Sequence, residues 1–411
     1  MKLIWLKSIF LIGIFSSSIL KSIEESPLIV IVLMIKNEES VIIETLRSYS
    51  ADFKYFLIFD TGSQDKTIDI IKQFFEENTH LTGYLAQKEF IDFSTSRNYA
   101  LDETEKVFPQ AQFMLMPDAE WYLYNGQGLI NFCKKHQNDT TDAYLVRGIF
   151  NNLDFYTTRL IRCKTGIRFH NQIHETLNRT VNQKVDSDVF FEVRVSPQGS
   201  QKSIRRWRRD LEILLDEYNK NPKNARNLFY LAQTYDCLGE LQTAFYFYEQ
   251  RRILSDDWIE ENFETLCRMG RIAHVLAPLD SNFTDEQSLS YYLQAHILMP
   301  HRAEPLVHIA QIYWPNCIPL CFLFIRRAVE LPYPINDSLF INKTLYDYDR
   351  YEILSKCASY MKEYELGERA TRQALSLKQT PELYQNLDFY LKALNKKIDW
   401  SRLSSLYINQ K

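Results

Sequence analysis

The sequence has little of what marks several large classes of protein. Its 411 residues include only 11 glycines and 13 prolines, so its composition is that of a globular chain and not of a disordered one. Its seven cysteines are odd in number and include no C-x-x-C pair, which argues against a zinc site and against a disulfide framework. We therefore expect reduced and mostly buried thiols.

Positive charge is not in excess either. The 48 Lys and Arg residues stand against 52 Asp and Glu residues, which gives a formal net charge of -4. Bulk binding to nucleic acid through phosphate neutralisation is therefore not expected. The first predicted strand is not followed by a G-x-G-x-x-G loop, which argues against a nucleotide-binding dehydrogenase.

A long hydrophobic run is also missing. Residues 1–26 place Lys2 and Lys7 before a short apolar stretch, Ser8 to Phe15, which falls short of the roughly 20 residues of a spanning helix. This leader resembles a secretion signal or a weak membrane anchor. We expect a protein that is membrane-associated through the leader, or cytoplasmic, with a secretory lumen as the alternative in a eukaryote.

From residue 27 the pattern alternates between strand and helix. The apolar runs "LIVIVLMI", "YFLIF", "LTGYLAQ" and "FMLMP" read as strands, and "EESVIIETLRSYS" and "TIDIIKQFFEE" read as helices between them. This alternation predicts a parallel sheet with helices on its faces. Ligands bind beyond the carboxyl ends of such strands.

Three polar clusters, "KNEE", "DTGSQD" and "DAE", fall at those ends, and we expect them to converge. Asp60 would accept hydrogen bonds from a nucleotide base or ribose, and the alternative for Thr61, Ser63 and Asp65 is helix capping. Two carboxylates at i and i+2, such as those in "DAE", suit one Mn²⁺ or Mg²⁺ ion.

Taken together, the motifs resemble a known family. In this order, "MIKNEES", "FDTGSQDKTIDII", "FIDFSTSRNYAL", "LMPDAEWYL" and "TRLIRCKTGIRFHNQIHETL" look like family 2 glycosyltransferases with a GT-A fold, in the branch that carries a C-terminal tetratricopeptide (TPR) region. The resemblance is strong over roughly residues 28–180. It implies an inverting transfer from a nucleotide-diphosphate sugar, most simply a UDP-sugar.

The resemblance also implies roles on the nucleotide side of the site. Asn37 and Glu38 match the loop beside the nucleotide, and Asp60 matches the aspartate that reads its base. Arg97 and Asn98 match a stretch near the donor pocket.

On the metal and acceptor side, the resemblance places Asp118 and Glu120 on the D-x-D motif, with Mn²⁺ or Mg²⁺ as cofactor. His174 and Glu175 match the family's H-E pair, where Glu175 would be the general base. The sequence departs from the family pattern at Glu120, where aspartate is usual, and at Gln64. These departures motivate the alternative of a catalytically weakened scaffold that binds a protein partner.

Two further basic or histidine-bearing segments have alternative interpretations. A zinc pair of His170 and His174 would need a helix, whereas the segment reads as loop or strand. Arg159 and Arg162 alternate with apolar residues in a predicted strand, and they either aim at phosphate or are solvated charges. The run "KSIRRWRRD" is a solvated helix turn or a phosphate or lipid contact.

The second half reads as helical repeats. The segments that begin at residues 225, 290 and 356 carry small residues and aromatics at the offsets of TPR helix pairs. We predict an α/β GT-A (Rossmann-like) domain at residues 27–196, followed by an all-α TPR-like domain at residues 197–411. The repeats are either a packing platform or the dock for a glycan, lipid-linked glycan or protein acceptor.

Overall fold

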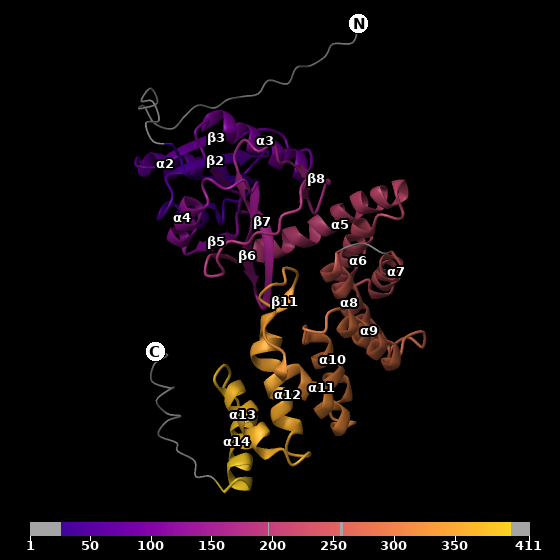
Figure 1. Cartoon of the computed structure of the whole chain (residues 1–411). Helices are drawn as coiled ribbons and strands as arrows, with labels where there is room; N and C mark the ends of the chain where they lie inside the picture. Colours follow the sequence, from indigo (N-terminus) through magenta and orange to yellow (C-terminus); the bar gives the residue numbers. More distant parts are fainter. Residues whose placement is uncertain (1–25, 196, 255–257, 396–411) are drawn as a thin grey trace. The chain divides into compact units, whose positions relative to one another are not determined.

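The computed structural model describes residues 26–195, 197–254 and 258–395 (Figure 1). The leader expected at residues 1–26 lies outside them except for its last residue. The chain forms two compact units that divide between Asp216 and Glu217, inside a long helix. None of the described helices combines the length and the apolar character needed to cross a membrane.

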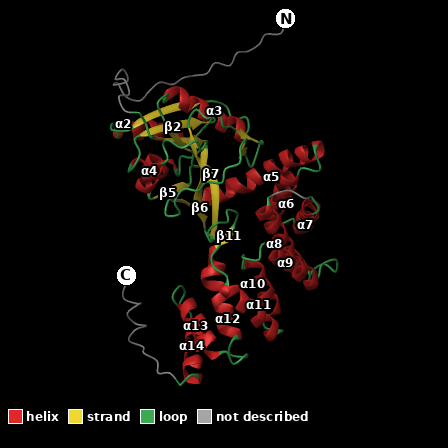
Figure 2. Ribbon diagram, in the orientation of Figure 1, coloured by secondary structure: helices red, strands yellow, loops and turns green. Residues whose placement is uncertain are grey.

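The first unit contains a sheet with flanking helices (Figure 2). Its strands are β1 (Ile29–Ile35), β2 (Tyr55–Asp60), β3 (Thr82–Gln87), β4 (Phe113–Leu115), β5 (Trp121–Tyr124), β6 (Ala143–Phe150), β7 (Leu153–Arg162), β8 (Phe169–His170), β9 (Thr176–Leu177) and β10 (Phe190–Val193). Its helices are α1 (Ile42–Ser50), α2 (Thr67–Glu77), α3 (Phe93–Val107), α4 (Gly126–Lys135) and the start of α5 (Pro197–Lys220).

The strand order is β3-β2-β1-β4-β7-β6-β10-β5. The four strands that the sequence predicts are confirmed, and they pair in parallel, with Ile31 opposite both Phe56 and Leu115. Strand β1 is buried on both faces: Ile31 and Leu33 belong to one apolar cluster, and Val30 belongs to another on the other side. This double burial explains its uninterrupted apolar sequence.

The prediction of a GT-A (Rossmann-like) parallel sheet is wrong for the part of the sheet beyond β4. Strand β7 runs antiparallel to both β4 and β6, and β5 runs antiparallel to β10, so the sheet is mixed. The cause is local: β6 and β7 are joined by a two-residue turn in which Asn151 has φ 52°. A turn this short can only connect antiparallel strands, whereas a parallel pair needs a long crossover.

The second unit is a succession of helices. They are α6 (Ala225–Cys237), α7 (Leu241–Arg252), α8 (Ile259–Leu276), α9 (Asp285–Leu298), α10 (Glu304–Tyr313), α11 (Ile318–Glu330), the π-helix η1 (Leu345–Asp349), α12 (Arg350–Cys357), α13 (Tyr364–Leu375) and α14 (Pro381–Ala393). From α6 to α14, each α-helix packs on the next. Ala232 and Ala244 are fully buried, as the repeat offsets predict, and Gly239 has φ 82° in the turn between them.

The predicted fold class, a GT-A domain followed by a separate all-α domain, is therefore corrected for this half as well. The second unit includes a short strand, β11 (Ile341–Asn342), so it is not all helical. The helices themselves, and the packing of each on the next, agree with the predicted repeats. The seven cysteines are free thiols, and four of them are buried, as expected: Cys133, Cys163, Cys321 and Cys357.

Candidate functional site

The first two predicted clusters meet in one pair of interlocked loops. The Asn37 backbone N–H donates to Ser63 Oγ at 2.9 Å, and the Gln64 N–H donates to Asn37 Oδ1 at 2.7 Å. The Glu38 N–H donates to Thr67 Oγ1 at 2.7 Å. Asn37 has φ 55°, a left-handed conformation that asparagine tolerates better than most residues. The loops after β1 and β2 therefore hold each other in place.

Asp60 closes the turn after β2. Its carboxylate accepts hydrogen bonds from the N–H groups of Gly62 and Ser63 at 3.1–3.2 Å, and from Gln87 Nε2 at 3.1 Å. Asp60 is fully buried, so these donors replace the water that the carboxylate has lost. Gly62 has φ 103°, which few residues other than glycine adopt. The aspartate at the tip of the strand is thus also the anchor of its own loop.

Helix capping accounts for only part of this loop. Asp65 accepts a hydrogen bond from the Thr67 N–H at 3.0 Å, at the start of α2. Ser63 Oγ instead accepts a hydrogen bond from the Asn37 N–H, and the Thr61 hydroxyl donates to the Ile35 carbonyl at 2.9 Å. The N-cap position of α2 is Lys66, which makes no side-chain capping bond, so of the three residues only Asp65 contacts the start of the helix, and the capping alternative fails for Ser63 and Thr61.

The third cluster belongs to a group of four charged side chains. Arg97 Nη2 donates to Asp118 Oδ1 at 2.7 Å, and Arg97 Nε donates to Glu175 Oε1 at 2.6 Å. Arg159 Nη2 lies 3.2 Å from Asp118 Oδ2, and its Nη1 lies 3.7 Å from Glu175 Oε1. We call Arg97, Asp118, Arg159 and Glu175 the charge quartet. It brings together residues from α3, β7 and two loops.

The two arginines of the quartet are buried, and one carboxylate is not. Arg97 is 3% exposed, while the Asp118 side chain is 39% exposed. The open side of the quartet therefore lies at Asp118, which is where a ligand can reach it.

Helix α1 fixes the loop that carries Asp118. Thr45 donates to the Ala119 carbonyl, and Tyr49 Oη donates to the Trp121 carbonyl at 2.6 Å. Tyr49 is fully buried, and burial, followed by the negative charge of Asp118, raises its pKa well above the usual value. The tyrosine is therefore a neutral donor, and Thr45 and Tyr49 together fix the residues that directly follow Asp118.

The loop that carries His174 and Glu175 is fixed by α3. Asn98 Nδ2 donates to the Phe169 carbonyl, and Asn98 Oδ1 accepts from the Phe169 N–H, both at 2.8 Å. These two bonds make Asn98 an anchor for β8. His174 has φ 49°, so the backbone turns sharply just before Glu175. The zinc interpretation has no support here, because His170 and His174 are not on a helix.

The quartet shifts the pKa values of its members. Burial acts to raise the pKa of Asp118, but the charges of Arg159 and Arg97 outweigh it and bring the pKa down to about 2. The pKa of Glu175 is also lowered, with burial opposing and Arg97 and Arg159 prevailing. Both carboxylates are therefore ionised at neutral pH. A lowered pKa keeps Glu175 in the form a general base needs but makes it a weak one.

The predicted metal ligands fit a divalent cation in donor type and in exposure. Asp118 and Glu120 are both partly exposed, and carboxylate oxygens are the donors that Mg²⁺ and Mn²⁺ prefer. Within the described part of the chain, no three His, Cys, Asp or Glu side chains gather closely enough to hold a metal by themselves. An ion at Asp118 would therefore need further oxygen ligands, such as those of a diphosphate.

The sequence-based list of site residues thus divides into two groups. Asn37 and Asp60 belong to the interlocked loops, and Arg97, Asp118 and Glu175 belong to the quartet. No hydrogen bond or ion pair joins Asp60 to Asp118 among the described residues, although both follow parallel strands of one sheet edge. The sequence does not distinguish Arg159 from Arg162, because strand alternation does not tell which arginine faces the site.

Comparison with known proteins relates the chain to a glycosyltransferase. It is 22% identical over 229 residues to the SPbeta prophage-derived glycosyltransferase SunS of Bacillus subtilis, over 54% of this chain and 52% of that protein. The glycosyltransferase SunS of Bacillus phage SPbeta matches to the same extent. The chain thus spans about half the length of these curated relatives, and no protein-family model matches it.

Two solved structures also show a partial likeness. The C-terminal part of a TPR repeat-containing protein from Cytophaga hutchinsonii has a TM-score of 0.35 and 16% identity, covering 47% of this chain and 68% of that chain. YrrB, described as a TPR protein with an unusual peptide-binding site, has a TM-score of 0.33 and 12% identity, covering 47% and 86%. Scores this low assign neither a fold nor a function.

Proposed function

We propose that this protein is a glycosyltransferase that takes a sugar from a nucleotide-diphosphate donor, most simply a UDP-sugar. The observation that carries the proposal is the charge quartet, which gathers ionised carboxylates and guanidinium groups around Asp118, beyond the carboxyl end of the parallel strand β4. The distant relationship to SunS supports the same reaction class. Such strand ends are where ligands bind in sheets of this kind.

In this proposal the interlocked loops hold the nucleotide. Asp60 is buried at the strand tip and already accepts two backbone N–H groups, so its charge is fixed in place before a ligand arrives. Each carboxylate oxygen has more than one acceptor site, which leaves capacity for a base N–H or a ribose hydroxyl. Asn37 and Glu38 shape the neighbouring loop.

Chemistry would take place at the quartet. Asp118, with Glu120, would hold Mn²⁺ or Mg²⁺, which supplies charge neutralisation for the leaving diphosphate. Glu175 would accept the proton of an acceptor hydroxyl, and an inverting transfer needs only one such base. His174 lies next to it in the same turn. Arg97 fixes both carboxylates, and Asn98 contributes by holding β8.

The acceptor is proposed to be a glycan, a lipid-linked glycan or a protein. Stacked helix pairs form surfaces that can take an extended chain, which favours docking of a peptide or glycan on the second unit. The alternative function, a weakened enzyme that acts as a scaffold, is favoured by Glu120 at the position where the family resemblance predicts aspartate.

The test is calorimetric titration of UDP and GDP into the full chain with and without Mn²⁺, repeated on Asp60→Asn and Asp118→Asn. We expect binding that is strengthened by the metal, lost or weakened at least tenfold in Asp60→Asn, and no longer strengthened by the metal in Asp118→Asn. Asp102→Asn is a matched control, because Asp102 is an exposed carboxylate paired with Arg168 on the same unit.

Absence of nucleotide binding under every metal condition would reject the enzyme and leave the scaffold. If binding is found, a Glu175→Gln variant should keep nucleotide affinity within about threefold and lose transfer by 10²-fold or more, the usual effect of removing a general base.

A further inference from the structure

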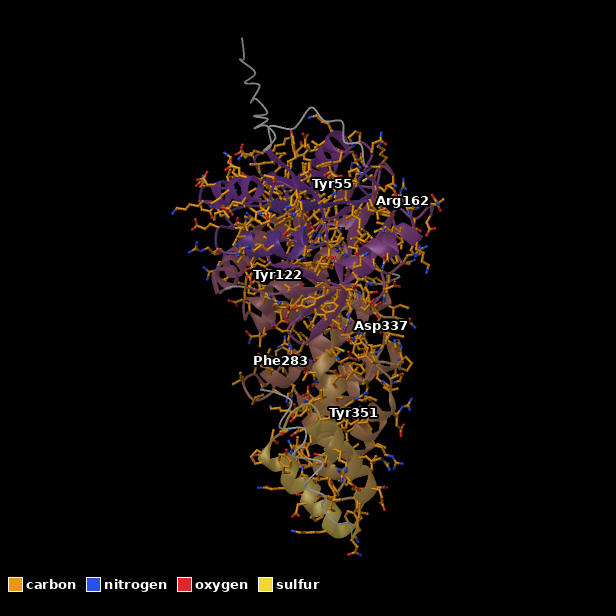
Figure 3. The ribbon with its side chains drawn as sticks, turned by 90° about the vertical axis from the view of Figure 1, so that its left-hand side faces the viewer. Tyr55, Tyr122, Arg162, Phe283, Asp337 and Tyr351 are labelled. Carbon is orange, nitrogen blue, oxygen red and sulfur yellow. The ribbon has the colours of Figure 1, made fainter. Side chains whose placement is uncertain are left out.

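Arg159 and Arg162 lie on the same strand, β7, but they have very different surroundings. Arg162, labelled in Figure 3, donates to the backbone carbonyls of His136, Gln137 and Thr141 at 2.7–2.9 Å. Those contacts are internal to the fold and engage all three nitrogens of the Arg162 guanidinium group. Arg159 instead faces Asp118 and Glu175, and its guanidinium carbon lies 5.0 Å from the centre of the Trp121 ring.

A β-bulge accounts for the position of Arg159. On β6, Tyr144 pairs with Leu160 and Leu145 pairs with Thr158, so the register passes over Arg159. The Arg159 carbonyl accepts instead from the Met116 N–H at 2.9 Å, just before the loop that carries Asp118. Bulges of this kind redirect a side chain and are common beside active sites. The hydrogen bond from Met116 extends the β4–β7 pairing by one residue and ties the Arg159 backbone to the start of the Asp118 loop.

Donor groups of the quartet are left without an acceptor. Arg97 Nη1 and Arg159 Nε are both buried and have no hydrogen-bond partner. The residues themselves are only 3% and 8% exposed, so water does not reach these atoms freely. A buried donor without an acceptor is destabilising, and such groups in a native fold call for a ligand or another explanation.

Further positive charge lies near the quartet. Burial, followed by the nearby charge of Arg97, lowers the pKa of Arg159, which shows that the two guanidinium groups repel each other. The charge of Arg206 on α5 acts on Asp118 as well. Arg209, one turn further along α5, stacks over Phe90 in the segment after β3, so the basic run of this helix lies against the same edge of the sheet. Arg206, which also lies 3.9 Å from Asp210, therefore adds positive charge near Asp118.

We infer that Arg159 is a ligand-binding residue that receives the anionic diphosphate of the donor, together with the spare donor of Arg97. This inference rests on the proposed function and extends it to a residue the family resemblance did not assign. A guanidinium group suits two oxygens of a diphosphate in a forked geometry. Arg206 adds charge from the side of α5.

The test uses the full chain and compares ligands with and without phosphate. The affinities of UDP, uridine and pyrophosphate are measured by calorimetry for the parent, Arg159→Gln, Arg159→Lys and the matched control Arg162→Gln. We expect Arg159→Gln to weaken UDP and pyrophosphate at least tenfold and to leave uridine within twofold, because a lost charged hydrogen bond costs about 1.5–3 kcal/mol. Arg159→Lys should recover part of the loss.

The control variant distinguishes the loss of a ligand contact from a general effect on the structure. Arg162→Gln is expected to lower the melting temperature while keeping the ratio of UDP to uridine affinity unchanged. Equal losses for UDP and uridine in Arg159→Gln, or no loss for either, would overturn the inference while leaving the proposed function intact. If the parent binds no nucleoside diphosphate and no pyrophosphate, both proposals fail. If Arg162→Gln does not fold, Arg168→Gln on an exposed ion pair takes its place.

Discussion

At the scale of single residues, Arg97 has the most demanding role in the first unit. It is almost fully buried, and it alone makes close hydrogen bonds to both Asp118 and Glu175. Removing one partner of a buried ionic group leaves the others with their desolvation cost and without compensation. The stability of the quartet therefore depends on this side chain more than on any single carboxylate.

We predict that Arg97→Met lowers the free energy of unfolding by about 3 kcal/mol, the lower end for a broken buried ion pair because Asp118 is partly exposed. Arg168→Met is the matched control. Arg168 pairs with Asp102, and their side chains are 34% and 55% exposed, so a loss below about 1 kcal/mol is expected. Chemical denaturation of both variants is the measurement. Equal losses would mean that the quartet adds no more stability than a surface pair.

At the scale of elements, one close contact joins β3 and α2. Gly83 on β3 faces the Phe75 ring so closely that an added Cβ would lie 2.6 Å from it. Both Phe75 and the neighbouring Phe56 are buried, and their rings meet edge to face at 5.6 Å. The position of α2 on the sheet, and with it the loop between Asp60 and Thr67, depends on this contact.

We therefore predict that Gly83→Ala destabilises the protein by about 1–3 kcal/mol, because overpacking forces the ring or the helix to move. The double variant Gly83→Ala/Phe75→Leu should recover part of that loss. Thermal unfolding of the single and double variants measures the coupling. A single variant within about 0.5 kcal/mol of the parent would show that the ring moves aside freely.

At the scale of the whole molecule, we expect the charge quartet to affect how the free energy of unfolding depends on pH. The pKa of Asp118 is about 2 in the folded protein, against about 3.9 in an unfolded chain. A carboxylate whose pKa is lower in the folded state stabilises the fold above the unfolded pKa, and this contribution is lost as the pH falls through the folded pKa. Glu175 acts in the same direction.

We predict that the difference in stability between the parent and Asp118→Asn is largest above pH 4 and shrinks as the pH falls toward 2. The asparagine does not titrate, so only the parent loses this contribution. This difference is measured from the denaturant midpoints of both proteins between pH 2 and pH 6. Parallel curves for the two proteins over this range would show that Asp118 is not held by the arginines in solution.

The sequence by itself determined the local elements and provided the candidate site residues. The four parallel strands, the helices between them and the small buried residues of the helical half follow from hydrophobic periodicity and side-chain size, which are local properties. Asn37 and Asp60 were found because they directly follow strands. Arg97 and Glu175 are candidates through the family resemblance, and Asp118 is one through that resemblance and through its i, i+2 spacing to Glu120.

Only the tertiary structure decided how the sheet continues beyond β4 and which arginine belongs to the site. The antiparallel strands depend on a two-residue turn and on pairing between segments far apart in the chain. Hydrophobic periodicity along the sequence predicts neither of these. Arg159 and Arg162 look alike in sequence, and a bulge of one residue separates their surroundings. The GT-A assignment failed for this reason: strand alternation identifies strands, whereas long-range pairing decides their direction and what their side chains meet.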